Sequence, residues 1–357
     1  MRIALVYNAK GSLPPDARLA ADGELTEEEL FAECDSPKTI DAVARAIRSG
    51  GHDVTPLDAT RDVYEQLRRG RFELVFNLAE GVIGEAREAQ VPAMLEFLGI
   101  PYTGSDPITL AIAHHKARAK DVWRARGVAV PDGVTVPLGD AVPRALPRAR
   151  AWIVKPVAEG SSKGVRDSNL VRTRAEVAAR VAEVHRRFRQ AALVEEFLEG
   201  REFTVALLGN GASLRVLPIV EIDFSSLPAG AKPIYSYEAK WIWDRTDAPL
   251  EIFSCPAKTS ATLRRRLSAI AVDAFRALGC RDWSRVDLRL GADGRPRVIE
   301  INPLPGVLPD PDENSCFPKA ARAAGLTFDQ AILAVIDAAV GRLGLAAPRH
   351  ARKAAAR

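Results

Sequence analysis

The first hundred residues alternate short apolar runs with amphipathic stretches. The expected elements are strands at Arg2–Tyr7, 52–57 and 73–76, and helices at 37–47 and 93–98. Ser36 is placed to cap the first helix and Gly50 to end it. Strands that alternate with helices predict a parallel sheet with crossover helices. The segment between Tyr7 and Ser36 reads as a long loop, and loops of that length are often functional.

The rest of the chain carries two further sets of elements and no internal repeat. The first set comprises a polar helix at 108–126, a strand at 152–155, a Gly/Ser loop and a charged helix at Arg174–Phe188. The second comprises strands at Glu202–Leu208, 214–221, 284–290 and 297–301, a helix at 260–278 and a closing helix at Phe328–Leu343. A length of 357 residues allows two or three domains.

Composition narrows the class of protein. With 47% hydrophobic and 27% charged residues the chain reads as an ordinary globular protein, and its net charge is only +4. Part of that charge lies in the basic segment 346–357, which we interpret as a solubilising tail. No nucleic-acid recognition motif accompanies it, so no nucleic-acid partner is expected.

The four cysteines, Cys34, Cys255, Cys280 and Cys316, show no metal-ligand spacing. A disulfide framework is not expected in a chain of this size that shows no signal peptide. No apolar run approaches the roughly 18 residues that a membrane helix needs. We therefore expect a reduced, cytoplasmic protein with no membrane partner.

Two segments suggest nucleotide binding. Lys155 ends a predicted strand and is followed by a loop that contains Ser161 and Ser162, which suits phosphate because backbone N–H groups can wrap the oxygens. Further on, Glu195 and Glu202 flank a linker and could accept hydrogen bonds from an adenine amino group and ribose hydroxyls. Taken alone, the first segment also fits a solvated hairpin and the second a polar turn.

A third segment suggests a metal site. Arg285, Asp287 and Arg289 alternate with apolar residues, so they share one face of a strand. Ten residues later Glu300 and Asn302 repeat the pattern. A hairpin of these strands would present Asp287, Glu300 and Asn302 together, and Mg²⁺ would offset the cost of burying two adjacent carboxylates. Chance alternation on an exposed face is the alternative.

A fourth segment, 101–105, precedes a predicted helix that carries Lys116 and Lys120. One of these lysines could reach phosphates from a second direction, although a helical lysine is usually only solvated.

These segments, in this order, resemble the D-alanine–D-alanine ligase family of the ATP-grasp superfold over residues 70 to 345. The most specific pieces are 100–105, Lys155 with 160–162, 200–205, 300–303 and 305–306. The resemblance implies an α/β (α+β) fold of three domains in which the last two sandwich ATP. The expected boundaries are 1–104 for the N-terminal domain, 105–195 for the central lid domain, 196–345 for the catalytic domain and 346–357 for the tail.

The resemblance also implies roles for individual residues. ATP would be bound by Lys116, Lys155, Ser162, Glu195, Leu198 and Glu202, and two Mg²⁺ ions by Asp287, Glu300 and Asn302. Arg285 and the backbone N–H of Gly306 would line the oxyanion site, while Ser161 and Lys240 belong to loops that close over it. Substrates would contact Ser315, Cys316, Trp241, Glu80 and Glu33.

The implied chemistry is formation of a C–N bond at the expense of ATP. A substrate carboxylate attacks the γ-phosphate while Mg²⁺ and lysines offset the repulsion between anions. An amine then attacks the acyl phosphate, and Arg285 stabilises the oxyanion. Loop closure keeps water out.

Four features depart from the family pattern, and all four concern the substrates. Trp241 stands where the ligase that joins two D-alanines usually has tyrosine, and Glu80 stands where the family usually has histidine. Residues 309–312 form an insert beside the second-substrate site. The N-terminal loop aligns poorly, so Glu33 is only a candidate for the glutamate that binds the first amino group.

Three functions follow from these observations. The first is a ligase that joins an amino-acid carboxylate to an amine, with a homodimer as the default assembly. The second, favoured by Trp241 and the insert, is a natural-product ligase that uses a non-peptide acceptor. The third is a silent nucleotide-binding regulator, whose mark would be loss of a metal ligand or of Arg285, and none is lost.

Overall fold

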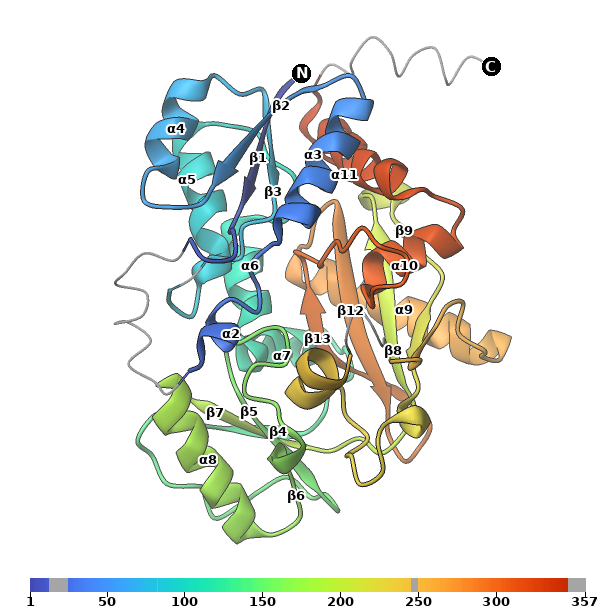
Figure 1. Cartoon of the computed structure of the whole chain (residues 1–357). Helices are drawn as coiled ribbons and strands as arrows, with labels where there is room; N and C mark the ends of the chain where they lie inside the picture. Colours follow the sequence, from blue (N-terminus) through green and yellow to red (C-terminus); the bar gives the residue numbers. More distant parts are fainter. Residues whose placement is uncertain (13–24, 82, 245–249, 346–357) are drawn as a thin grey trace.

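The computed structural model describes residues 1–12, 25–81, 83–244 and 250–345. The predicted tail at 346–357 and part of the long N-terminal loop lie outside the described residues. Three sheets follow one another along the chain: a three-stranded sheet, a four-stranded sheet and a six-stranded sheet. Figure 1 shows the first and second sheets at opposite ends of the molecule, with the third beside both.

The N-terminal sheet is parallel, as predicted, with the strand order β2-β1-β3. Its elements are β1 (Arg2–Tyr7), α3 (Pro37–Ser49), β2 (Asp53–Asp58), α4 (Val63–Gly70), β3 (Leu74–Asn77) and α5 (Gln90–Leu98). Ser36 caps α3 by accepting a hydrogen bond from the Thr39 amide at 3.2 Å, which confirms the predicted helix start.

The four-stranded sheet is antiparallel, with the order β4-β7-β5-β6. Its elements are β4 (Gly133–Val136), β5 (Trp152–Pro156), β6 (Leu170–Val171), α8 (Arg174–Phe188) and β7 (Ala192–Glu196). Helix α8 begins and ends where the sequence predicts, and a capping box at Thr173 and Glu176 fixes its start. Its valines pack on those of β5 and β7, so α8 covers one face of the sheet.

The third sheet carries the predicted hairpin. Its elements are β8 (Glu202–Leu208), β9 (Arg215–Val216), β10 (Val220–Ile222), β11 (Phe253–Ser254), α9 (Ala261–Leu278), β12 (Trp283–Leu290) and β13 (Pro296–Asn302). Strands β12 and β13 pair antiparallel, with Asp287 opposite Glu300. The prediction of a single strand at 214–221 is wrong, since the structure has two separate strands, β9 and β10. Pro218 lies between them and has no N–H to donate to a β-ladder.

The prediction of one long helix at 108–126 is also wrong. The structure has α6 (Pro107–His114) and α7 (Lys116–Ala125), which are separated at His115. His115 is extended, and its ring Nδ1 accepts from the Arg118 amide at 3.3 Å, so it caps the second helix. In one continuous helix the Lys116 amide would donate to a carbonyl of the preceding turn. Here it donates to the carbonyl of Val157 at 2.8 Å. This break brings Lys116 next to the four-stranded sheet.

Helix α7 also contacts the third sheet's layer, since Trp123 donates its indole N–H to the carbonyl of Ala274 in α9 at 3.0 Å. The predicted domain boundaries at 104 and 195 stay predictions.

The long N-terminal loop contains a short helix in its described part. Helix α2 (Glu27–Leu30) starts at Thr26, whose side chain forms a capping box with Glu29. It lies between the N-terminal sheet and the four-stranded sheet (Figure 1). This helix was not predicted, because four residues are too few to show a helical period.

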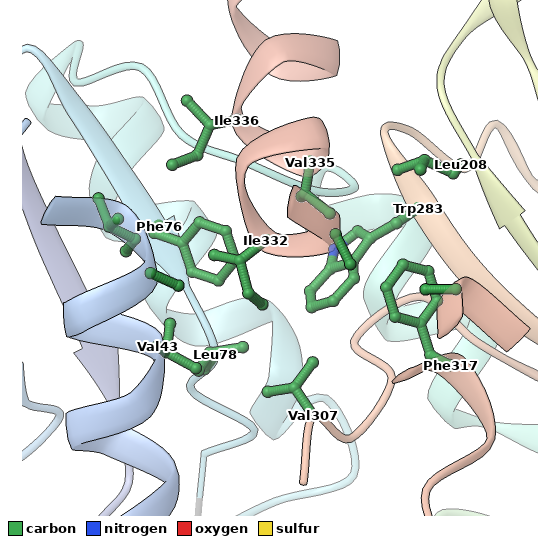
Figure 2. Packing of buried hydrophobic residues seen from close by; sticks show 14 of the residues in the cluster. Val43, Phe76, Leu78, Leu208, Trp283, Val307, Phe317, Ile332, Val335 and Ile336 are labelled. Carbon is green, nitrogen blue, oxygen red and sulfur yellow. The ribbon is translucent and has the colours of Figure 1, made fainter. Parts of the chain in front are cut away.

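The closing helices join the two ends of the chain. Helices α10 (Cys316–Ala323) and α11 (Phe328–Leu343) pack with α3 and β3 on one side and with β8 and β12 on the other. Trp283 lies at the centre of this cluster, with its ring centroid 5.9 Å from that of Phe76 and 5.1 Å from that of Phe317 (Figure 2). One apolar core therefore fixes the N-terminal sheet against the third sheet.

Within the described residues, no single helix is long and apolar enough to cross a membrane. One bent pair, α10 with α11, would qualify by combined length and composition.

Replacing Trp283 with alanine should destabilise the protein by about 3–5 kcal/mol, because it opens a cavity between three elements. The midpoint of thermal unfolding should fall by on the order of 10 °C. Trp283→Phe should cost less than half as much, since a phenyl ring fills most of the space. Phe97→Ala removes an aromatic ring that is 81% exposed and serves as the matched control. An equal loss in both alanine variants would contradict the proposed centre of the core.

Candidate active site

A cleft lies between the four-stranded sheet and the third sheet. It is lined by residues of β5, β7, β8, β12 and β13 together with the Gly/Ser loop and the segment 234–240. Twelve of the predicted site residues lie on its walls: Lys116, Lys155, Ser161, Ser162, Glu195, Leu198, Glu202, Lys240, Arg285, Asp287, Glu300 and Cys316. Residues up to 200 positions apart in the sequence thus meet in one place.

Charged residues of β12 and β13 form the floor of the cleft. Asp287 accepts a hydrogen bond from the Thr204 hydroxyl at 2.8 Å, and its other oxygen lies 3.2 Å from Arg285. Glu300 lies 3.3 Å from the ammonium group of Lys116. The two carboxylates therefore lie next to each other, between Arg285 on one side and Lys116 on the other.

The two carboxylates differ in their electrostatic environment. Burial raises the pKa of Asp287, and the nearby charge of Glu300 raises it further against the opposing effect of Arg285. Burial also acts to raise the pKa of Glu300, but Lys116, Lys155 and Arg285 lower it to about 2. Glu300 is thus ionised at neutral pH, while Asp287 is the carboxyl that a further cation would relieve.

These residues fit a divalent cation that is bound together with phosphate. Among the described residues no group of three or more His, Cys, Asp and Glu side chains could hold a metal ion unaided. Asp287 and Glu300 supply two carboxylates, and the third predicted ligand, Asn302, has an amide oxygen that accepts from the Leu304 amide at 2.9 Å. A carbonyl oxygen keeps a second lone pair, so this bond leaves Asn302 able to coordinate. Phosphate oxygens of a nucleotide would complete the set, as is usual for Mg²⁺.

A buried ion cluster lies at the lysine-bearing side of the cleft, where phosphate binding is predicted. Glu195 is 1% exposed and lies 2.8 Å from Lys155 and 3.1 Å from Lys120. Burial lowers the pKa of Lys120 to about 8, although Glu195 opposes the shift. Lys120 also donates to the carbonyl of Ile299. The predicted contact of Glu195 with adenine stays a prediction, and the carboxylate visibly holds the two lysines in place.

Apolar side chains also line the cleft: Phe197 and Leu198, which follow β7, together with Ile153 and Ile299. Such a slot suits the flat face of a purine. Glu202 borders it and is 2.8 Å from Arg289. Burial raises the pKa of Glu202 despite that arginine.

Two loops meet above the cleft. Ser161 and Ser162 adopt left-handed backbone conformations, with φ of 51° and 60°, which are costly outside glycine. Contacts with the second loop hold them: the Ser162 hydroxyl donates to the Tyr235 carbonyl at 2.8 Å, and Lys240 lies 3.3 Å from the Ser161 hydroxyl. Trp241 donates its indole N–H to the Ser161 carbonyl at 3.0 Å. Indole therefore joins the two loops through a backbone acceptor.

The predicted second-substrate residues lie at the start of α10. The Ser315 hydroxyl donates to the Gly306 carbonyl at 2.8 Å, which brings the predicted oxyanion residue beside it. Cys316 is the first residue of α10 and lines the cleft. The insert next to this site is tied to α3, because Lys38 lies 3.0 Å from Asp310.

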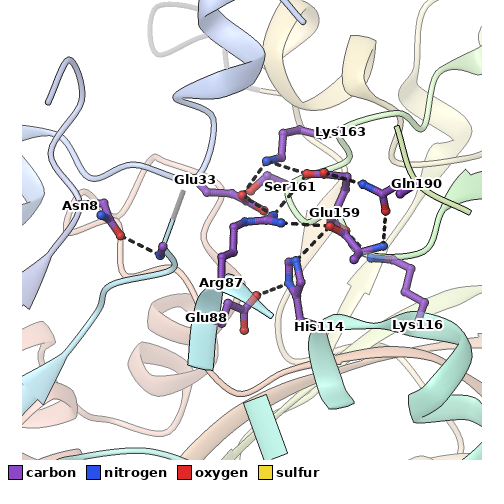
Figure 3. Close-up of polar contacts among 12 residues, drawn as sticks. Asn8, Glu33, Arg87, Glu88, His114, Lys116, Glu159, Ser161, Lys163 and Gln190 are labelled. Atoms are coloured by element: carbon purple, nitrogen blue, oxygen red, sulfur yellow. Dashed lines mark hydrogen bonds and ion pairs between the residues drawn. The ribbon is translucent and has the colours of Figure 1, made fainter. Parts of the chain in front are cut away.

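Glu33 lies beneath the Gly/Ser loop and outside the residues that line the cleft (Figure 3). Its carboxylate is 2.6 Å from Lys163 and 2.8 Å from Arg87, and both cations also contact Glu159. Burial acts to raise the pKa of Glu33, but Arg87 and Lys163 lower it well below its usual range. The side chain thus anchors the loop, and its binding of a substrate amino group stays a prediction.

Glu80 sits close to this network and to the second loop. Burial raises its pKa well above the usual range, and the charges of Glu33, Glu88 and Asp35 add to the shift. Burial and the charge of Arg285 lower the pKa of Lys240, and Glu80 opposes that shift, so Glu80 and Lys240 share one electrostatic environment. Burial and the neighbouring acids therefore favour the neutral, protonated form of the Glu80 carboxyl group.

Sequence reasoning missed several residues that build the site. Lys163 belongs to the Gly/Ser loop and could have been noticed as an extra charge within it. Arg87, Glu159 and Glu29 carry no pattern that marks them, because their partners are distant in the sequence and only the fold brings them together.

A cleft between two antiparallel sheets, with lysines at one end, paired carboxylates on its floor and two loops above, defines an ATP-grasp ligase. Two solved structures share the fold. The D-alanine–D-alanine ligase of Bacillus anthracis in complex with ATP matches with a TM-score of 0.66 at 21% identity, covering 95% of this chain and 97% of that one. The VanG D-Ala:D-Ser ligase of Enterococcus faecalis matches with a TM-score of 0.67 at 21% identity, covering 95% and 99%.

The sequence comparisons identify the family. The family model described as the D-ala D-ala ligase C-terminus matches residues 149–337. The D-alanine–D-alanine ligase of Xanthomonas axonopodis pv. citri is 34% identical over 342 residues, which cover 94% of this chain and 98% of the relative. An uncharacterised protein of Sinorhizobium fredii is 36% identical over 307 residues, which cover 84% and 86%. The chain belongs to the D-alanine–D-alanine ligase family, and it is an ATP-dependent enzyme that forms C–N bonds.

Asp287→Asn and Glu300→Gln should each lower Mg²⁺-dependent ATP turnover by on the order of 100-fold or more, because each removes a charged metal ligand. Calorimetric titration with Mg²⁺ and ADP should show a matching loss of metal-dependent binding. The unfolding midpoint should change little, since both side chains border the cleft. Asp293→Asn, at an exposed turn between the same two strands, is the matched control. Retained turnover in either site variant would refute the metal assignment.

Asp35 should make stability depend on pH. Burial raises its pKa to about 7, whereas an unfolded aspartate titrates near 4. The folded chain therefore binds more protons than the unfolded chain between these values, and stability falls as pH rises through this window. Asp35→Asn should remove this loss of stability. The free energy of unfolding of the variant, relative to that of the unaltered protein, should rise by about 1 kcal/mol from pH 6 to pH 8.

Unfolding midpoints at the two pH values measure this effect. Asp41→Asn, on the exposed side of α3, controls for the removal of one negative charge. A constant difference between Asp35→Asn and the unaltered protein would contradict the assignment.

Proposed function

We propose that this protein joins two small amino acids through an amide bond, with D-alanine as the first candidate for both positions. The observation that carries the proposal is the row of Lys116, Glu300, Asp287 and Arg285 across the floor of the cleft, in which two adjacent carboxylates lie between two cations. Such a row can neutralise the phosphates of ATP at one end and a developing oxyanion at the other. The curated relatives that carry the name D-alanine–D-alanine ligase support this choice of substrate.

The phosphate end of the cleft provides fixed positive charge. Lys155 and Lys120 are held by the same carboxylate of Glu195, so their ammonium groups do not need to reorganise when phosphate arrives. Lys116 adds a third ammonium group from α7, beside Glu300. ATP with Mg²⁺ supplies the phosphoryl group that activates the first carboxylate.

Arg285 faces the reacting end. It is only 22% exposed and lies against Asp287; burial acts to lower its pKa, but the charges of Asp287 and Glu300 raise that pKa and keep the guanidinium charged. A guanidinium at this place can donate to an oxyanion that forms when the amine attacks. Gly306, which we place on the other side of that oxyanion, is held at the start of α10, where its carbonyl accepts a hydrogen bond from the Ser315 hydroxyl.

The two loops above the cleft exclude water from the activated carboxylate. Ser161, Lys240 and Trp241 join them directly. Because water would hydrolyse an activated acyl group, closure of these loops is part of the chemistry and not only of binding.

The number of metal ions, the cellular location and the assembly are proposed from family membership. We propose that two Mg²⁺ ions bind at Asp287, Glu300 and Asn302. We also propose that the enzyme works in the cytoplasm, where ATP is available, and that it forms a homodimer.

Phosphate release from ATP should depend on Mg²⁺ and on an added amino acid. With D-alanine alone, the enzyme should release phosphate and form an equal amount of dipeptide, as measured by coupled phosphate detection and mass spectrometry. L-alanine is the matched control substrate. Release that requires a different acid, or a separate amine acceptor, would keep the ligase chemistry and reject D-alanine as the substrate. No amino-acid-dependent release from any pair would overturn the proposed function.

A further inference from the structure

Arg166 lies at the end of the Gly/Ser loop, outside the cleft. The residue before it, Val165, lines the cleft, and Arg166 itself does not. Its backbone amide is fixed by the side chain of Asn169 at 2.8 Å, so its position relative to the loop is set locally. Its side chain is 29% exposed and forms ion pairs with other segments of the chain.

The guanidinium of Arg166 contacts three groups from two distant segments. One nitrogen lies 3.0 Å from Glu29 of α2, and another lies 3.5 Å from Glu238 at the start of the π-helical turn 238–243. The guanidinium carbon is 5.0 Å from the ring centroid of Tyr237. A planar group with several donors can meet all three at once, which an ammonium group cannot.

The N-terminal partner is rigidly held. Glu29 is completely buried, and its carboxylate also lies 2.8 Å from Arg187 of α8 and accepts from the Thr26 amide at 3.0 Å. A buried carboxylate needs such partners, and removing one is costly. Helix α2 is therefore fixed to α8, and Arg166 extends that fixed point to the Gly/Ser loop.

The other partner leads back to the cleft. Glu238 accepts a hydrogen bond from the Asp167 amide at 3.2 Å, and the Tyr237 amide donates to the Val165 carbonyl at 2.7 Å. Two and three residues further on, Lys240 and Trp241 bind Ser161. A displacement at Arg166 would thus reach both loops that stand above the reacting groups.

We propose that Arg166 is a positioning residue for the ligase reaction: it couples α2, the Gly/Ser loop and the segment 232–243, so that both loops stay closed while the activated carboxylate waits for the amine. The proposal rests on the proposed function, because it concerns the fate of that activated carboxylate. Arg166 is not among the residues that line the cleft. It acts through Ser161 and Lys240.

The readout that separates positioning from mere stabilisation is the amount of phosphate released for each amide formed. In the unaltered enzyme this ratio should be close to one. In Arg166→Ala the loops should part more often, water should hydrolyse the activated carboxylate, and the ratio should rise at least about threefold. The KM for ATP should change less, since the residues of the nucleotide end are untouched.

Arg180→Ala is the matched control. Arg180 belongs to the neighbouring helix α8, its side chain is also 29% exposed, and it pairs with Glu183 of the same helix. Loss of this arginine should leave the ratio near one. Thermal unfolding of both variants records any effect on stability.

Arg166→Lys provides a second variant if the alanine protein does not fold. Lysine keeps the charge but, as a point charge, can meet only one of the two carboxylates, so the ratio should still rise. A ratio that stays near one in Arg166→Lys and in any folded Arg166→Ala, whatever the unfolding midpoint, would overturn the proposal. Absence of amino-acid-dependent phosphate release in the unaltered enzyme would instead overturn the proposed function.

Discussion

Antiparallel pairing of β12 with β13 sets Asp287 directly across from Glu300, and the rest of the cleft is organised around the repulsion between these two carboxylates. Burial makes that repulsion expensive. Arg285 beside Asp287 and Lys116 beside Glu300 offset part of it. Lys116 can do so only because the chain breaks its helix at His115 and enters the cleft from the side. A local feature of one hairpin thus dictates where a distant helix must end.

Charge neutralisation recurs at each junction between the sheets. Glu195 holds Lys120 and Lys155, Glu33 holds Arg87 and Lys163, and Glu29 holds Arg166 and Arg187. Each acid is buried and meets two cations. Pairs of this kind contribute little net stability compared with an apolar contact, but they define geometry sharply, since a carboxylate that loses its cations inside the protein is costly. The apolar cluster around Trp283 holds the N-terminal sheet against the third sheet, and the ion pairs fix how the loops are aligned.

Periodic elements could be predicted from the sequence because each carries its signal within itself. The alternation in β12 and β13 predicted both the hairpin and the shared face of Asp287 and Glu300, and the cap at Ser36 predicted the start of α3. The break at His115 could not be seen, since the bond that replaces helix pairing comes from Val157. Nor could the contact between Glu29 and Arg187, which are 158 residues apart. Long-range pairs between charged residues leave no local pattern, and the resemblance to a known family transfers only the positions at which its motifs match.

The loop contacts have a consequence for the kinetics of nucleotide entry. In this structure the Gly/Ser loop is anchored by Glu33 on one side and joined to Lys240 and Trp241 on the other, and the same loop lines the cleft in which we propose that ATP binds. A nucleotide that enters past this loop has to wait until several of these bonds open together. Association would then be limited by the frequency of that opening, so its observed rate would reach a plateau as ATP concentration rises, instead of climbing in proportion to it.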